Sequence, residues 1–166
     1  MLKDRIKAAR ERRSNRIEEI LESRRYAKAQ RIVHHKKTSV AAHSLRTAEY
    51  GSRISRWLNR HGIEVNEEDV VEACLLHDIG MTDDEVSSSA SWKKAYRHPK
   101  KSEQIAREEY HANENQCNAI RRHMWPICII PPKSIEGWVV VAADKCGSFD
   151  DLIEGAHEAT EGEGTE

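Results

Sequence analysis

The sequence has few of the features that mark several common protein classes. Its four cysteines include no C-x-x-C pair, and Cys74 and Cys117 stand among apolar residues at helical spacing, where thiols are usually buried. Neither a disulfide framework nor a cysteine–zinc site is therefore indicated. No apolar run approaches the length of a membrane span, and the N-terminal MLKDRIKAARERR lacks the apolar region of a secretion signal. We expect a cytoplasmic protein without membrane contact.

An excess of charge of one sign is also missing. The 166 residues contain 27 Lys and Arg against 28 Asp and Glu, a formal net charge of −1. Nucleic acid is therefore an unexpected partner, since no overall attraction to it exists. The charge is nevertheless uneven, because the N-terminal part is basic and the C-terminal end is acidic. We predict a charged helical extension over 1–31, a domain over 32–155 and a disordered acidic tail over 156–166.

The N-terminal extension predicts one long charged helix, because residues 2–31 contain neither Gly nor Pro. Ile17, Ile20 and Leu21 form a narrow apolar stripe along it. This pattern is typical of a solvated helix that docks on a domain through its stripe. A contact between two copies of the chain, giving a homodimer, and a weak RNA-binding arm are the other two interpretations.

The rest of the chain shows helical periodicity and no clear alternating strand, so the predicted class is all-α. Asn66 has the character of an N-cap, and the run after it is apolar on nearly all sides up to Gly80, which predicts a central buried helix. Pro99 is expected in the first turn of a later helix. The predicted helices cover residues 39–60, 67–79, 98–110 and 114–124 and a last one that opens at Pro132, with a loop or short helix over 81–97.

Histidine and aspartate stand where apolar helical segments end. His77 and Asp78 lie in LLHDIG (75–80), and Asp144 follows the apolar stretch that begins at Trp138. Buried ionisable groups cost free energy unless they are paired or bind a metal, and imidazole with carboxylate suits divalent transition metals. For Asp144 alone, a satisfied buried carboxylate is the other interpretation. No Ser-His-Asp or Cys-His nucleophile arrangement and no Gly-rich phosphate loop is visible, so a metal would carry the chemistry.

Together with His43 in AAHSLRTA and Asp144 in AADKC (142–146), the LLHDIG segment resembles the HD superfamily of metal-dependent phosphohydrolases. The order and spacing are similar to the H…HD…D signature of that family, and the resemblance runs from about residue 34 to 150. It implies an HD-domain helical bundle whose metal is held by His43, His77, Asp78 and Asp144. It also implies catalytic roles for His77, Asp78 and Asp144.

Two further segments, RHPKKS (97–102) and IRRHMWP (120–126), are similar to elements of the family members with two metals. The resemblance implies a second metal on His98 and His123, with Asp78 as the bridge. One or two divalent ions per chain are expected, and Fe, Mn, Zn, Ni and Co all suit such ligands. HD-GYP phosphodiesterases share the six-ligand pattern, but this chain lacks the GYP motif and most resembles small bacterial HD-domain proteins of unassigned substrate.

The expected substrate is a small phosphate ester or nucleotide, hydrolysed by a water molecule that the metal centre activates. His35 is a candidate substrate contact because it stands eight residues before His43, where resembling proteins often have a histidine. Basic residues suit phosphate, although each of them also fits an exposed helix charge or a carboxylate partner. The basic candidates are Arg46, Lys100, Arg121, Arg122 and Lys145. Two alternatives stay open: a di-iron oxygenase of the same superfamily, and a non-catalytic nucleotide-sensing HD domain.

Overall fold

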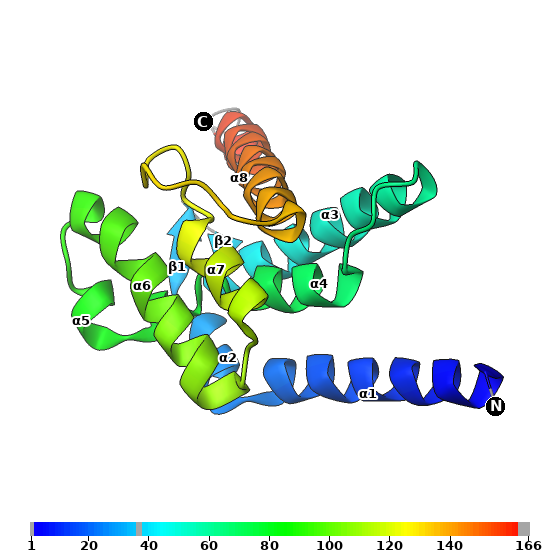
Figure 1. Ribbon diagram of the computed structural model, residues 1–166. Coiled ribbons are helices and arrows are strands. Elements are labelled where there is room, and N and C mark those ends of the chain that lie inside the picture. Colours follow the sequence, from blue (N-terminus) through cyan, green and yellow to red (C-terminus); the bar gives the residue numbers. More distant parts are fainter. Residues whose placement is uncertain (1, 36–37, 163–166) are drawn as a thin grey trace.

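The computed structural model describes residues 2–35 and 38–162, and it is mainly helical over them (Figure 1). The all-α prediction is therefore confirmed, with one short antiparallel ribbon in which Val33 pairs with Ser39. The elements in chain order are α1 (Leu2–Glu22), α2 (Arg24–Ala29), β1 (Val33–His35), β2 (Thr38–Ser39), α3 (Val40–Arg60), α4 (Glu67–Leu76), the 3₁₀ turn η1 (Ile79–Thr82), α5 (Asp84–Ser87), α6 (Ser91–Tyr110), α7 (Glu114–Arg122) and α8 (Ile135–Gly162).

The predicted long N-terminal helix is divided into α1 and α2 at Ser23. The Ser23 hydroxyl accepts a hydrogen bond from the Tyr26 amide at 3.1 Å and donates to the Ile20 carbonyl at 2.8 Å, so one side chain ends α1 and caps α2. Ile20 is buried, and Ile17 and Leu21 pack against the core, as the apolar stripe predicts. Figure 1 shows the remainder of α1 extending beyond the body of the molecule.

A buried carboxylate fixes the place where α1 meets the body. Glu72 of α4 accepts hydrogen bonds from Arg16 Nη2 at 3.1 Å and from Gln116 Nε2 at 3.0 Å. Arg16 Nη2 also donates to the Tyr110 carbonyl at 2.8 Å. One guanidinium therefore joins α1 to α4 and to the end of α6.

The core is built around α4, which packs against α3, α7 and α8. Its residues from Val70 to Leu76 are all buried, which confirms the predicted central helix. Asn66 caps it, because the Asn66 side chain accepts from the amides of Glu68 and Asp69. The C-terminal end of α4 carries His77 and Asp78 into the interior, where both are buried.

Helix α6 begins at Ser91 and not at His98, so Pro99 lies inside the helix and the prediction of a first-turn proline is wrong. Proline lacks the amide hydrogen, which removes one helical hydrogen bond. The helix continues because the turn around Pro99 is held by its surroundings: His98, Pro99 and Ser102 are all buried. Segment 81–97, expected to be a loop or short helix, instead forms the end of η1, α5 and the first turns of α6.

Contact between η1 and α6 is so close that only glycine fits at residue 80. A Cβ on Gly80 would lie 2.6 Å from the His98 carbonyl oxygen and 2.6 Å from the Ser102 amide nitrogen. The Gly80 amide donates to Ser102 Oγ at 2.9 Å. This approach places the turn that follows Asp78 directly against the turn of α6 that carries His98.

The C-terminal helix α8 runs to Gly162, so residues 156–162 are helical where the sequence predicts a disordered tail. Residues 163–166 lie outside the described part, and the predicted domain boundaries stay predictions. Among the residues that the structure describes, no helix has both the length and the apolar character needed to cross a membrane.

Candidate metal centre

Six buried side chains from five helical segments converge in the interior. Each lies at a helix position that points it inward, and each is a residue for which the sequence predicts a metal-binding role. They are His43 from α3, His77 and Asp78 from the end of α4, His98 from α6, His123 from the end of α7 and Asp144 from α8.

One half of the cluster consists of His43, His77 and Asp144. His43 Nε2 lies 3.1 Å from Asp144 Oδ1, and His77 Nε2 lies 3.5 Å from the same oxygen. A candidate ligand atom from each of the three residues lies within 4.8 Å of the other two. Two imidazole nitrogens and a carboxylate oxygen at this separation are a donor set suited to a divalent transition metal.

The other half is built around Asp78. Its Oδ1 lies 3.1 Å from His98 Nε2 and 3.4 Å from His123 Nε2, and these two nitrogens lie 3.0 Å apart. Its Oδ2 lies 3.4 Å from His77 Nε2. The two oxygens of Asp78 therefore face different histidines, one on each side of the cluster.

Hydrogen bonds at Nδ1 fix the orientation of the histidine rings. In three of them Nδ1–H donates to a carbonyl of the preceding helical turn, which leaves Nε2 as the nitrogen facing the cluster. These bonds join His77 to Cys74 O at 2.7 Å, His98 to Lys94 O at 2.6 Å and His123 to Ile120 O at 2.7 Å.

His43 is oriented differently, by a carboxylate that the sequence analysis missed. His43 Nδ1 donates to Asp151 Oδ2 at 2.7 Å, and the Asp151 side chain is fully buried. Arg46 Nη1 lies 2.8 Å from Asp151 Oδ1. Arg46 thus supports this carboxylate and is not among the residues that line the metal pocket, and its contact with substrate stays a prediction. Asp151 stands seven residues after Asp144, two helical turns along the same face of α8, and this spacing is the sequence signal that could have identified it.

The donor atoms fit a bound cation. His77 Nε2 is buried and has no hydrogen-bond partner among the described residues. The nitrogens of His98 and His123 that approach to 3.0 Å are both acceptors when Nδ1 carries the proton, and two lone pairs at that distance repel unless positive charge lies between or beside them. Divalent ions bound in the two halves of the cluster would satisfy these nitrogens.

The electrostatics of the cluster also favour positive charge. Burial by itself lowers the pKa of His77, but the carboxylates of Asp78 and Asp144 outweigh burial and raise this pKa to about 9. Burial by itself raises the pKa of Asp144, but the contacts with His43 and His77 outweigh it and hold this pKa well below its usual range. For His123 burial is the largest effect, and its pKa is lowered. Two buried carboxylates thus create a field that a cation would offset.

A pocket of about 360 Å³ opens onto the cluster. One wall is polar, with Lys94 and Lys145, and Lys145 Nζ lies 2.5 Å from Asp144 Oδ2. Sequence analysis anticipated Lys145 but not Lys94. Apolar side chains and the metal-facing residues make up the rest of the lining. The lining residues are Val33, Asp78, Met81, Lys94, Ala95, His98, His123, Met124, Asp144, Lys145 and Ser148.

Three of the predicted substrate contacts lie elsewhere. Lys100, Arg121 and Arg122 line a different groove and not the metal pocket, and their predicted contact with substrate stays a prediction. Helical geometry explains their position, because residues next to a ligand in sequence are turned by about 100° or more from it around the helix axis. The side chain of His35 lies outside the described residues, and its role stays a prediction.

Comparisons with known proteins agree with this arrangement. Residues 40–147 match the family model described as HD domain. No curated protein matches the chain. A solved structure of a conserved hypothetical protein from Pyrococcus furiosus is similar, with a TM-score of 0.57 and 19% sequence identity over 82% of this chain and 84% of that chain. At this identity the likeness concerns the fold alone.

Proposed function

The chain belongs to the HD domain family, and from this membership and the geometry of its buried cluster we propose that it is a metal-dependent hydrolase of a small phosphate ester or nucleotide. HD domains are mostly metal-dependent phosphohydrolases, and they bind divalent metals. The substrate and the number of metals are part of the proposal.

The position of Asp78 carries the proposal. Its two oxygens face His77 on one side and His98 and His123 on the other, which supports a proposal in which this one carboxylate would be a ligand to two cations. In this arrangement His43, His77, Asp78 and Asp144 would hold one ion, and Asp78, His98 and His123 would hold the second. When bound, divalent ions lower the pKa of a water molecule toward neutrality and offset the negative charge of phosphoryl oxygens.

The pocket walls suit the two parts of an organic phosphate. Lys94 and Lys145 bring ammonium groups to the polar wall, where they would hold phosphoryl oxygens that do not react. Val33, Met81 and Met124 form an apolar wall against which the organic part would pack. A volume of about 360 Å³ is at the small end of ligand sites, which favours a small metabolite over a polymer.

The test is phosphate release from a panel of nucleotides and phosphate esters. Protein stripped of metal would be reloaded separately with Mn, Co, Ni, Zn or Fe under anaerobic conditions. We expect turnover with at least one metal, and loss of both turnover and bound metal in His77→Ala and Asp78→Ala. His61→Ala is the matched control, because His61 is exposed and its Nδ1 also contacts a carbonyl of the preceding turn, that of Trp57.

Three results would contradict the proposal. Full activity in both ligand variants would remove the metal centre from the reaction. Turnover that requires iron and oxygen would identify an oxygenase. Nucleotide binding without turnover for any metal would identify a sensor. Elemental analysis measures the number of metal ions per chain. A value of about two would support both sets of ligands, and a value of about one would mean that His98 and His123 have a different role.

A further inference from the structure

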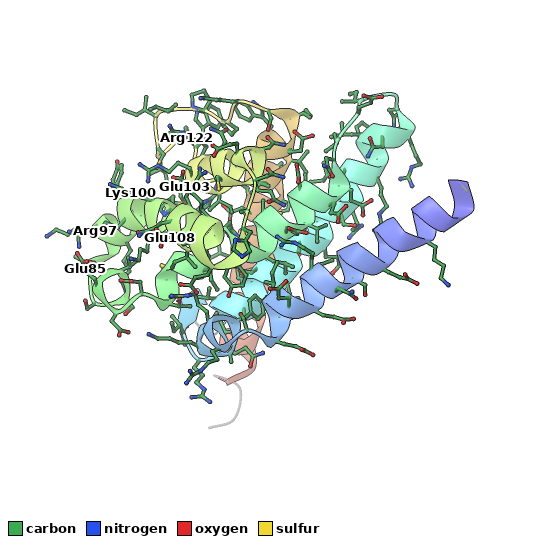
Figure 2. The ribbon with its side chains drawn as sticks, turned by 60° about the horizontal axis from the view of Figure 1, so that its bottom comes forward. Glu85, Arg97, Lys100, Glu103, Glu108 and Arg122 are labelled. Atoms are coloured by element: carbon green, nitrogen blue, oxygen red, sulfur yellow. The ribbon has the colours of Figure 1, made fainter. Side chains whose placement is uncertain are left out.

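A second polar groove, of about 540 Å³, lies between α6 and α7 on their outer side. Five cationic side chains and two carboxylates line it, so positive charge is in excess. The lining residues are Lys100, Glu103, Arg107, Glu114, Asn115, Cys117, Asn118, Arg121, Arg122 and Lys133. Figure 2 shows three of them, Lys100, Glu103 and Arg122, on neighbouring parts of the two helices.

This groove is distinct from the metal pocket. On α6, Lys100, Glu103 and Arg107 repeat at intervals of three and four residues and so share one face of the helix. At about 100° per residue this face is turned roughly 140–200° away from His98, which points into the metal centre. The residues that line the groove do not line the metal pocket.

Both carboxylates of the groove are already paired. Arg107 forms a salt bridge with Glu114 and reaches Glu103 at 3.5 Å. Arg121 Nε lies 3.8 Å from the other oxygen of Glu103. These four residues pair with one another. The pKa of Glu114 is lowered mainly by Arg107 and to a smaller extent by Lys133, so among the remaining cations Lys133 also interacts with this carboxylate.

Lys100, Arg122 and Lys133 are the remaining cations, and their side chains make no hydrogen bond or ion pair with any residue that the structure describes. Arg122 Nε is moreover a buried donor with no hydrogen-bond partner in the described part of the chain. Buried donors are nearly always satisfied by protein, water or ligand. Asn118 adds a donor, because its Oδ1 accepts from the Lys133 amide at 3.0 Å and leaves its NH₂ group for another contact.

We propose that this groove is a second binding site, for an oligophosphate anion such as the phosphate chain of a nucleotide or inorganic pyrophosphate. The guanidinium of Arg122 and the ammonium groups of Lys100 and Lys133 supply charge-assisted hydrogen bonds of the kind that phosphate oxygens accept. A bound anion would join α6 and α7 on the side opposite His98 and His123. The site uses no metal, so it does not depend on the proposed hydrolase function.

The test is calorimetric titration of the metal-free full chain with sodium pyrophosphate and, separately, with adenosine triphosphate, at fixed ionic strength. We expect saturable binding of one anion per chain, weakened at least tenfold in the double variant Lys100→Gln/Lys133→Gln. Both lysines are exposed, so this variant should fold normally, and Arg122→Gln provides an independent second variant. Tighter binding of adenosine triphosphate than of pyrophosphate identifies a nucleotide; equal binding identifies the phosphate chain alone.

A control variant separates the groove from the effect of general charge. Arg97→Gln removes an exposed cation of α6 that pairs with Glu85 at 3.2 Å and does not line the groove. It should bind the anions as the unchanged chain does. Unchanged binding in the groove variants, an equal loss of binding in Arg97→Gln, or the absence of saturable binding would each overturn the proposal.

Discussion

Replacing Asp151 should weaken the metal centre, although Asp151 does not itself face the cluster. Its carboxylate holds Nδ1 of His43 at 2.7 Å and lies 2.8 Å from Arg46, so it fixes the direction in which His43 presents Nε2. In Asp151→Ala the imidazole loses this acceptor and can rotate. We therefore expect weaker metal binding together with a less stable metal-free protein.

The size of each effect follows from burial. The Asp151 side chain is fully buried and that of Arg46 is 25% exposed, so Asp151→Ala breaks a pair of which one member still reaches water. Removing one partner of a buried pair costs about 3–5 kcal/mol, and the exposure of Arg46 favours the lower end, about 3 kcal/mol. Loss of a carboxylate behind a metal-binding histidine typically reduces metal affinity roughly 10–100-fold. Asp151→Asn retains an oxygen acceptor and should lose less on both measures.

Two assays separate these effects. Urea unfolding of the metal-free protein measures stability, and competition with a chromogenic chelator measures the affinity for Zn or Mn. The matched control is Asp150→Asn, because Asp150 is the neighbouring carboxylate and accepts from the Tyr50 hydroxyl at 2.5 Å instead of from His43. Equal metal affinity in Asp151→Ala and Asp150→Asn would refute the argument that Asp151 positions His43, whatever the change in stability.

Three further predictions concern the same framework. Chelation of bound metal should lower the Tm, since a cation present at about 1,000 times its Kd contributes about 4 kcal/mol; an unchanged Tm would exclude a metal held by the folded state. Gly80→Ala places a methyl group 2.6 Å from the His98 carbonyl oxygen, so it should lower the free energy of unfolding by about 1–3 kcal/mol in urea. It should also reduce the number of metals per chain in elemental analysis. Full metal content would show that η1 does not set the position of His98. Arg16→Ala leaves the buried Glu72 without its guanidinium and should cost about 3 kcal/mol in urea unfolding, whereas Lys7→Ala, in an exposed pair with Glu11, should cost almost nothing.

The core of the site could be predicted from the sequence because its residues break a strong local pattern. His77, Asp78 and Asp144 are ionisable groups at the ends of apolar segments, and few arrangements other than metal binding tolerate that burial. Their convergence with His98 and His123, by contrast, was inferred from a family resemblance. Periodicity alone places residues on helix faces but does not say which helices meet.

The features that escaped prediction depend on tertiary packing. Pro99 is a helix-start signal locally, and only the close approach of Gly80 to α6 shows why the helix passes through it. Asp151 lies in an acidic segment next to Asp150, and only its spacing of two helical turns from Asp144 distinguishes the two, once Asp144 is known to face the cluster. Arg122 is next to His123 in sequence, and this adjacency predicts that both line one pocket. In the helix the two side chains point in different directions, and they line different pockets.

The hydrogen bonds behind the histidine rings imply that the two halves of the centre differ in their resistance to proteolysis. His77, His98 and His123 are each oriented by a carbonyl from the same stretch of helix, so these rings would keep their direction as long as their own helices persist. His43 depends on Asp151, 108 residues away along the chain. A single cleavage in α8 between Asp144 and Asp151 would keep all six metal-facing residues and yet release His43. The cleaved chain would lose metal binding first in the half of the centre that contains His43 and Asp144.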